Sequence, residues 1–155
     1  MKIRRALWTF CGSLAAAALL MCAIPANPAA AEQIARPSNP GGPGAAATLT
    51  GNAKAGAKIF ADKCMACHGA EGKGGVPNPG STDGTVPPLN PIDSTMVSKN
   101  YKVFAYNIDL FLQNGSVPDG PHPAISMPPW GADKMLTQQQ LADVIAYVIS
   151  LNPAK

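Results

Sequence analysis

The sequence predicts a small all-α domain with long connecting loops, and three observations support this. Apolar residues recur at helical spacing in three segments that begin or end at helix-capping residues. The remaining segments are poor in the alternating β-branched residues that are typical of strands. Gly 15 and Pro 16 make up about a fifth of the 155 residues, so the connections between helices should be long. With 14% charged residues, the chain resembles neither a charged disordered protein nor a coiled coil.

The first residues are typical of an export signal. Lys2, Arg4 and Arg5 precede an apolar stretch over residues 6–24, and small residues ending at Ala31 follow it. We expect residues 1–31 to be a signal peptide that directs the protein to the periplasm. The alternative is an uncleaved anchor that holds the protein on the inner membrane facing the periplasm, because 19 residues approach the length of a membrane span.

Residues 32–50 should connect this leader to the domain. Ala, Pro and Gly dominate the segment, and its apolar residues show no periodicity. The sequence therefore predicts a flexible linker over residues 32–50 and a folded domain over residues 51–155.

The first predicted helix begins after Asn52 and runs to about Lys63. The Asn52 side chain can cap the first backbone N–H groups of the helix. Its apolar stripe consists of Ala53, Ala57 and Phe60. Gly56 lies beside this stripe, where a second backbone could approach closely.

Two further helices follow later in the chain. The second is predicted from apolar residues at helical spacing, namely Val97, Tyr101, Phe104, Ile108, Phe111 and Leu112, and Asn114-Gly115 should end it. For the third, Thr137-Gln138-Gln139-Gln140 has the form of a capping box. Its apolar residues are Leu141, Val144, Ile145, Val148 and Ile149, and Asn152-Pro153 should terminate it.

The most specific signal is Cys64-Met65-Ala66-Cys67-His68, which has the spacing of a c-type haem attachment site. On a helix, residues three apart share a face, so both thiols can reach one edge of a porphyrin while His68 ligates its iron. The alternatives are a thioredoxin-like dithiol, a structural zinc site and a plain disulfide. The histidine next to the second cysteine favours covalent haem over these three.

A haem held by one histidine has a second axial position, and Met127 is the best candidate for it. The prolines of Met127-Pro128-Pro129-Trp130-Gly131 prevent a helix and place the methionine on a stiff extended loop. Met127 as a core residue remains the alternative. The other candidates in the domain are Met65, Met96, Met135 and His122. Of these, Met65 lies inside the attachment motif, and His122, between two prolines, is typical of an exposed loop residue.

These motifs resemble the class I cytochromes c with a single haem, in particular the bacterial modules that serve dehydrogenases or terminal oxidases. The resemblance spans nearly all of residues 52–151 and implies the class I cytochrome c fold, with three main helices and long loops wrapped around one covalently attached haem. In the family, a glycine and an aromatic residue of the first helix pack on the last helix, and Gly56, Phe60, Val144 and Tyr147 match that pattern. The resemblance further implies that the carbonyl group of Pro87 holds His68.

The same resemblance implies a function. A His68- and Met127-ligated haem c would carry single electrons between respiratory or dehydrogenase partners outside the cytoplasm, as a free carrier or as a subunit of an oxidoreductase complex, rather than as an enzyme. A dehydrogenase, an oxidase or another cytochrome would be the partner. The alternative is a haem enzyme or sensor with an open or labile sixth site.

The charge distribution bears on the partners. Three of the 12 Lys and Arg residues lie in the first five positions, which leaves nine against nine Asp and Glu in the rest of the chain. A body without net charge disfavours binding to nucleic acid. Membrane association is expected only through an uncleaved N-terminus.

Overall fold

The computed structural model describes residue 38 and residues 40–153. The predicted signal peptide lies outside these residues. The α-helices of the described chain are α1 (Ala53–Lys63), α2 (Met65–His68), α3 (Tyr101–Asn114) and α4 (Gln138–Leu151). Short 3-10 helices are η2 (Ala45–Thr48), η3 (Ala70–Gly72) and η4 (Ser94–Met96). Within the described residues β-pairing is limited to two isolated bridges, which confirms the all-α class. None of the helices in this part of the chain has the length and hydropathy of a membrane span.

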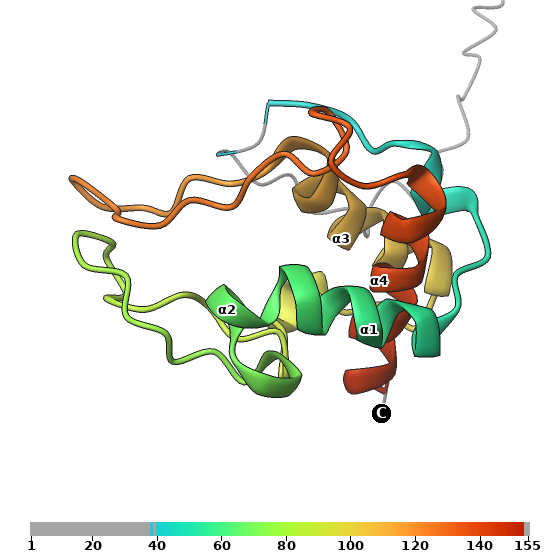
Figure 1. The fold of residues 1–155 in the computed structure, drawn as a ribbon, viewed down its shortest axis with the longest axis horizontal. Helices are drawn as coiled ribbons and strands as arrows, with labels where there is room; N and C mark the ends of the chain where they lie inside the picture. The colour runs from blue at the N-terminus through green and yellow to red at the C-terminus, as the bar shows by residue number, and fades with distance from the viewer. Residues whose placement is uncertain (1–37, 39, 154–155) are drawn as a thin grey trace, which may run out of the picture.

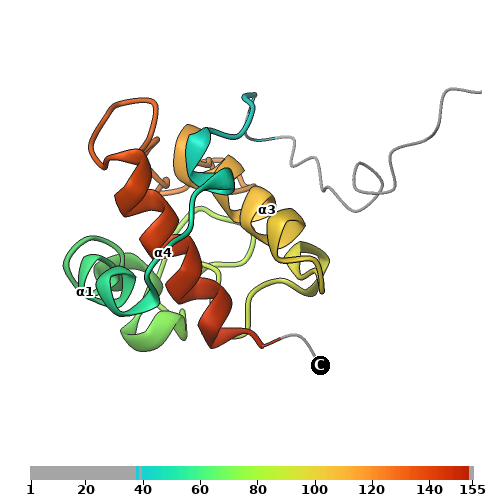
Figure 2. The same ribbon diagram turned by 90° about the vertical axis from the view of Figure 1, so that its right-hand side faces the viewer.

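The other two long helices, α1 and α3, both pack against helix α4. Figure 2 shows it between α1 on one side and α3 on the other. Its inward residues are almost completely buried, with Leu141, Val144, Ile145 and Val148 at most 2% exposed. Two long loops, residues 74–92 and residues 115–132, leave the helices in the same direction and run side by side (Figure 1).

The crossing of α1 and α4 has the packing that the sequence predicts. The rings of Phe60 and Tyr147 lie 5.2 Å apart at 58°, a tilted arrangement that contributes about 0.5–1.5 kcal/mol beyond buried area. Gly56 lies against the backbone of α4, where a Cβ atom would collide with the carbonyl oxygen of Asp143. The N-terminus of α1 is capped as expected, because the Asn52 side chain accepts hydrogen bonds from the N–H groups of Lys54 and Ala55.

Helix α4 begins and ends where the sequence predicts. The N–H of Gln140 donates to Thr137 Oγ1 at 3.2 Å, and the N–H of Thr137 donates to Gln140 Oε1 at 2.9 Å, which completes the capping box. Asn152 follows the last turn, and its Nδ2 donates to the carbonyl oxygens of Val148 and Leu89. The end of α4 is therefore tied to the segment just after Pro87.

The second predicted helix starts later than expected. The helical spacing includes Val97, but α3 begins at Tyr101, after Asn100, whose side chain accepts from the N–H of Lys102. Val97 is extended, with φ −76° and ψ 134°, and is 37% exposed. Its inclusion was wrong because apolar spacing does not reveal which polar residue caps the first turn.

The prediction of a flexible linker up to residue 50 is also wrong over its last part. Residues 40–50, called the strap below, lie across α3 and α4 and include η2. The N–H of Gly44 donates to Asp109 Oδ2 at 2.7 Å, and the N–H of Ala46 donates to Gln138 Oε1 at 3.0 Å. Ala46 is 1% exposed. Burial raises the pKa of the Asp109 carboxyl group, against the opposing effect of hydrogen bonds from Gln113 and the strap.

We predict that Gly56→Ala lowers the free energy of unfolding by about 1–3 kcal/mol, because the added methyl group overpacks the crossing. This loss should appear although Ala ordinarily stabilises a helix interior by about 1 kcal/mol relative to Gly. Gly42→Ala is the matched control, since a Cβ atom there meets nothing within 4 Å. Urea unfolding measures both variants, and equal midpoints for the two would contradict the close crossing.

Candidate functional site

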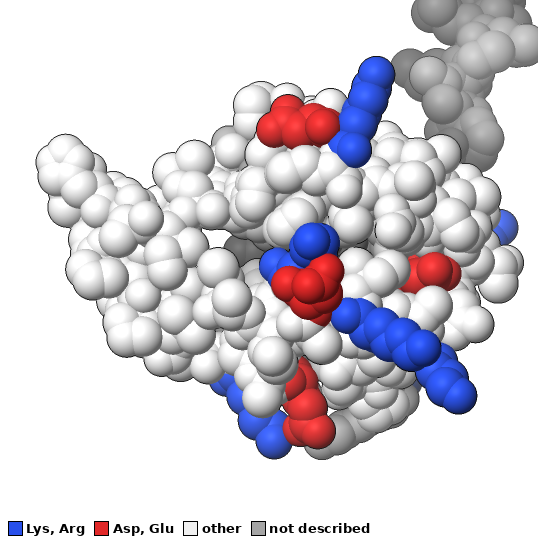
Figure 3. Space-filling model, in the orientation of Figure 1, with Lys and Arg blue, Asp and Glu red and all other residues white. Residues whose placement is uncertain are grey.

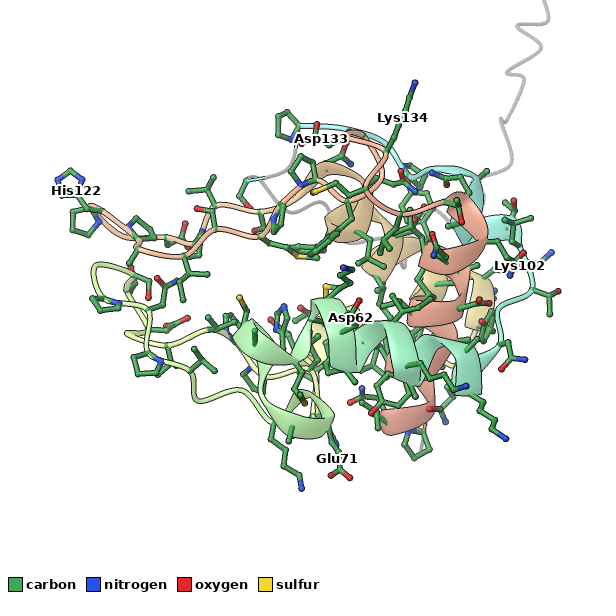
Figure 4. All side chains as sticks on the ribbon, in the orientation of Figure 1. Asp62, Glu71, Lys102, His122, Asp133 and Lys134 are labelled. Atoms are coloured by element: carbon green, nitrogen blue, oxygen red, sulfur yellow. The ribbon has the colours of Figure 1, made fainter. Side chains whose placement is uncertain are left out.

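A cavity is lined by residues of α1 and α2 on one side and by residues of α3 and the 115–132 loop on the other. It has an empty volume of about 1090 Å³, counted with its open side. Its walls are mostly apolar, and the main contributors from the helices are Phe60, Ile108, Phe111, Leu112, Val144 and Val148. In Figure 4 the side chains of the two walls face each other across this space. The cavity brings together all five residues that the sequence singled out: Cys64, Cys67, His68, Pro87 and Met127.

The two cysteines lie where α1 passes into α2. Cys64 ends α1 and begins α2, and the N–H groups of Cys67 and His68 donate to its carbonyl oxygen at 3.1 and 2.9 Å. This turn places both cysteines in the lining of one cavity. Burial, and secondly Cys67, raises the pKa of the Cys64 thiol to about 11. A redox-active dithiol needs the opposite shift, because the thiolate is its reactive form.

His68 is held in one tautomer by its hydrogen bond to Pro87. Its Nδ1 lies 3.2 Å from the carbonyl oxygen of Pro87, which can only accept, so the proton belongs on Nδ1. The lone pair of Nε2 is then available to a metal, with the ring orientation fixed. Burial lowers the pKa of His68, while the bond to Pro87 acts in the other direction. A neutral imidazole is the form that ligates iron.

Met127 lies on an extended segment of the opposite wall. Alternate residues from 123 to 129 are partly buried and those between them are exposed, as expected for an extended chain with one face toward the domain. Met127 is on the inward face and packs against the core. Its N–H donates to the carbonyl oxygen of Ser116 at 2.8 Å, and the N–H of Ser116 donates back at 3.0 Å.

The end of α3 fixes this segment further. The N–H groups of Gly131 and Ala132 donate to the carbonyl oxygens of Leu112 and Gln113, each at 3.0 Å, and so satisfy two acceptors that a helix end leaves open. Gly115 turns the chain with φ +69°, and a Cβ atom on it would meet the Met127 carbonyl oxygen and the Pro129 nitrogen. The loop that carries Met127 is therefore built onto the helix terminus.

The other candidates for an axial ligand lie in different surroundings. Met65 and Met135 are 43% and 45% exposed. His122 is exposed at the tip of the 115–132 loop, far from α2 (Figure 4). Met96 is buried and also lines the cavity, and its carbonyl oxygen accepts from Asn107 Nδ2 at 3.0 Å. Among the residues that the structure describes, no three His, Cys, Asp or Glu side chains form a metal-binding group.

The comparison with protein families decides the identity of the fold. The model of the family described as cytochrome c matches residues 53–152, about two thirds of the chain. The chain belongs to the cytochrome c family. Comparisons with curated proteins and with solved structures found no match.

A class I cytochrome c binds one covalent haem c with its iron, and the cavity of this protein fits that group. The walls are apolar, as a porphyrin requires, and the two thiols of the attachment motif lie on one wall. His68 also lines the cavity, and its Nδ1 is already engaged by the carbonyl oxygen of Pro87. The sequence does not indicate some of the wall residues, among them Asn78 and Ser116, because each lies in a loop without periodicity.

We predict that Gly115→Ala lowers the stability of the protein more than a glycine substitution in a turn without close neighbours does, because the added Cβ atom collides with the Met127 segment. Gly84→Ala is the matched control, because Gly84 has nearly the same φ, +66° against +69°, but a Cβ atom on it meets nothing within 4 Å. Both positions have a φ that L side chains rarely adopt, and only Gly115→Ala adds a collision. It should be less stable than the control by about 1–3 kcal/mol in urea unfolding of this cytochrome c. Equal stabilities would show that the approach of Gly115 to Met127 is unimportant.

Proposed function

We propose that this cytochrome c transfers single electrons between redox proteins outside the cytoplasm, with its haem bound to Cys64 and Cys67 and ligated by His68 and Met127. The observation that supports this most directly is that His68, in α2, and Met127, in the 115–132 loop, both line one apolar cavity. Each of the two residues is fixed by its own contact, His68 by Pro87 and Met127 by Ser116.

This arrangement suits electron transfer because the residues that would ligate the haem hardly have to move when an electron is gained or lost. The haem supplies the one-electron chemistry, since its iron is stable in two oxidation states. Pro87 holds the proton on Nδ1 of His68 and so leaves the Nε2 lone pair available, and the pair of hydrogen bonds between Met127 and Ser116 holds the backbone that carries the thioether. The soft sulfur of methionine favours the reduced metal and raises the potential. The apolar walls exclude water, which limits reorganisation during transfer.

The alternative is a haem enzyme or sensor with an open or labile sixth site. The two functions differ in one residue, because an enzyme or sensor needs the position opposite His68 free for a small molecule. The contacts that hold Met127, from Ser116, Gly115 and the end of α3, favour the carrier.

We predict that the ferric protein shows a sulfur-to-iron absorption band and that Met127→Ala abolishes it. The reduction potential of the variant should also fall, because water or another hard ligand replaces the thioether. Met135→Ala, at an exposed methionine, and Met96→Ala, at the second methionine of the cavity wall, are the controls and should keep the band. High-spin ferric iron in the unsubstituted protein would support the enzyme or sensor, and loss of the band only in Met96→Ala would move the ligand to Met96.

The cellular location belongs to the same proposal. The basic residues and apolar stretch at the N-terminus support export to the periplasm, with an uncleaved anchor as the alternative. A dehydrogenase, a terminal oxidase or another cytochrome would then be the donor or acceptor. The intact mass of the exported protein gives leader removal and haem attachment in one measurement.

The surface near the cavity carries few charges, which bears on how a redox partner docks. Asp83 and Asp119 are the only Lys, Arg, Asp or Glu residues in the loops 74–92 and 115–132. The outer parts of these loops show none on the face seen in Figure 3. Lys63, on the cavity wall, pairs with Asp62 at 3.1 Å, so its charge is locally balanced. We propose a small, partly apolar docking surface around Cys64 and Cys67.

We predict a weak dependence of electron transfer on ionic strength. Oxidation of the reduced protein by anionic ferricyanide and by a cationic cobalt phenanthroline complex should change by less than about threefold between roughly 0.01 and 0.15 M salt, a range in which screening shortens from about 30 to 8 Å. Stopped-flow absorbance measures both rates. A steep change of opposite sign for the two reagents would reveal a charged docking site and contradict the proposed surface.

A further inference from the structure

Asn78 joins the two walls of the cavity through its side chain. It is 0% exposed and lines the cavity, although it lies in a Gly- and Pro-rich loop. Its Nδ2 donates to the carbonyl oxygen of Ile125 at 2.9 Å, and the N–H of Ile125 donates to its Oδ1 at 2.7 Å. One side-chain amide thus pairs with both backbone groups of a residue on the other loop, as a neighbouring strand would. We call this pair of hydrogen bonds the clasp.

The Asn78 end of the clasp is rigid. The N–H of Asn78 donates to the carbonyl oxygen of Gly84 at 2.8 Å, and its own carbonyl oxygen accepts from the N–H and Oγ of Ser81. The bridge between Pro77 and Thr85 closes the same loop at its base. This loop leads through Val86 directly into Pro87, the residue that holds His68. The clasp therefore starts from the wall that carries the histidine.

The Ile125 end of the clasp leads to Met127. Ile125 and Met127 are two apart on the extended segment, so their side chains share its inward face, and both line the cavity. Met127 is tied to α3 through Ser116, but that contact fixes it only relative to its own wall. The other hydrogen bonds between the two loops join backbone groups. The N–H groups of Ala124, Thr82 and His122 donate to the carbonyl oxygens of Pro79, Asp119 and Gly80, respectively. None of these six residues lines the cavity, whereas Asn78 does.

We propose that Asn78 is a positioning residue for the sixth ligand: its clasp sets the separation of the histidine wall and the methionine wall and keeps outside ligands from displacing Met127. The inference rests on the proposed ligation by His68 and Met127. It assigns to a loop asparagine a role at Met127 that acts through Ile125, the residue to which both side-chain hydrogen bonds of Asn78 go. Because both backbone polar groups of Ile125 are part-buried and pair with one amide, loss of that amide leaves them without this partner and favours an open loop.

The test compares haem-loaded Asn78→Ala with the unsubstituted protein and with Ser81→Ala. Ser81→Ala removes a hydrogen bond of the same loop but leaves both bonds of the clasp in place. We expect Asn78→Ala to bind imidazole to its ferric form at least about tenfold more tightly, since the population with Met127 displaced increases. Hydrogen exchange at the Ile125 amide should accelerate by a similar factor, and the reduction potential should fall. For Ser81→Ala, both the imidazole affinity and the exchange rate of the Ile125 amide should stay within about twofold of those of the unsubstituted protein.

The outcomes separate this inference from the proposed function. If the unsubstituted ferric protein lacks the sulfur-to-iron band, methionine ligation fails and the inference fails with it. If the band is present but Asn78→Ala keeps the original imidazole affinity and potential, the inference alone is wrong, even where the Ile125 amide exchanges faster. Should Asn78→Ala not fold, Asn78→Leu makes the same comparison, because its side chain keeps about the size of asparagine but can neither donate to the Ile125 carbonyl oxygen nor accept from its N–H.

Discussion

The structure depends on a cavity that its two walls must border without collapsing onto each other. One wall consists of α1, α2 and the segment up to Pro87, and the other consists of α3 and the loop with Met127. Helix α4 packs against both, through the close crossing at Gly56 on one side and its contact with α3 on the other. The protein chain therefore supplies a frame, and the haem of this cytochrome c supplies the apolar contacts that would otherwise come from side chains.

The features that the sequence revealed are those encoded by neighbouring residues. Asn52 and the capping box at Thr137 act on N–H groups within three positions, so their spacing alone predicts where α1 and α4 begin. The Cys64–His68 motif is equally local, because its five residues alone place both cysteines in the lining of the cavity. The contact of His68 with Pro87 spans 19 positions, and it was expected only from the resemblance to a family.

Features that depend on distant partners could not be read from the sequence. In the sequence the strap looks like a linker, because the side chains that accept its hydrogen bonds, Asp109 and Gln138, follow 65 and 92 positions later. Asn78 looks like an ordinary turn residue in a Gly- and Pro-rich stretch, and its partner Ile125 is 47 positions away. In both cases a polar side chain satisfies backbone groups of an irregular segment, and irregular segments have no periodicity that could reveal the pairing.

The contact between the tips of the two long loops has a consequence for how this surface can change in evolution. The tips meet through backbone groups: the N–H of Thr82 donates to the carbonyl oxygen of Asp119, and the N–H of His122 donates to the carbonyl oxygen of Gly80. Since peptide groups are the same in every residue, many side chains at the tips can be exchanged without breaking the contact. Gly80 and Gly120 are the exceptions, because a Cβ atom on either would strike the opposite loop. The tips thus combine a fixed shape with a freely variable chemistry, so substitutions there can change what this surface recognises while the interior stays unchanged.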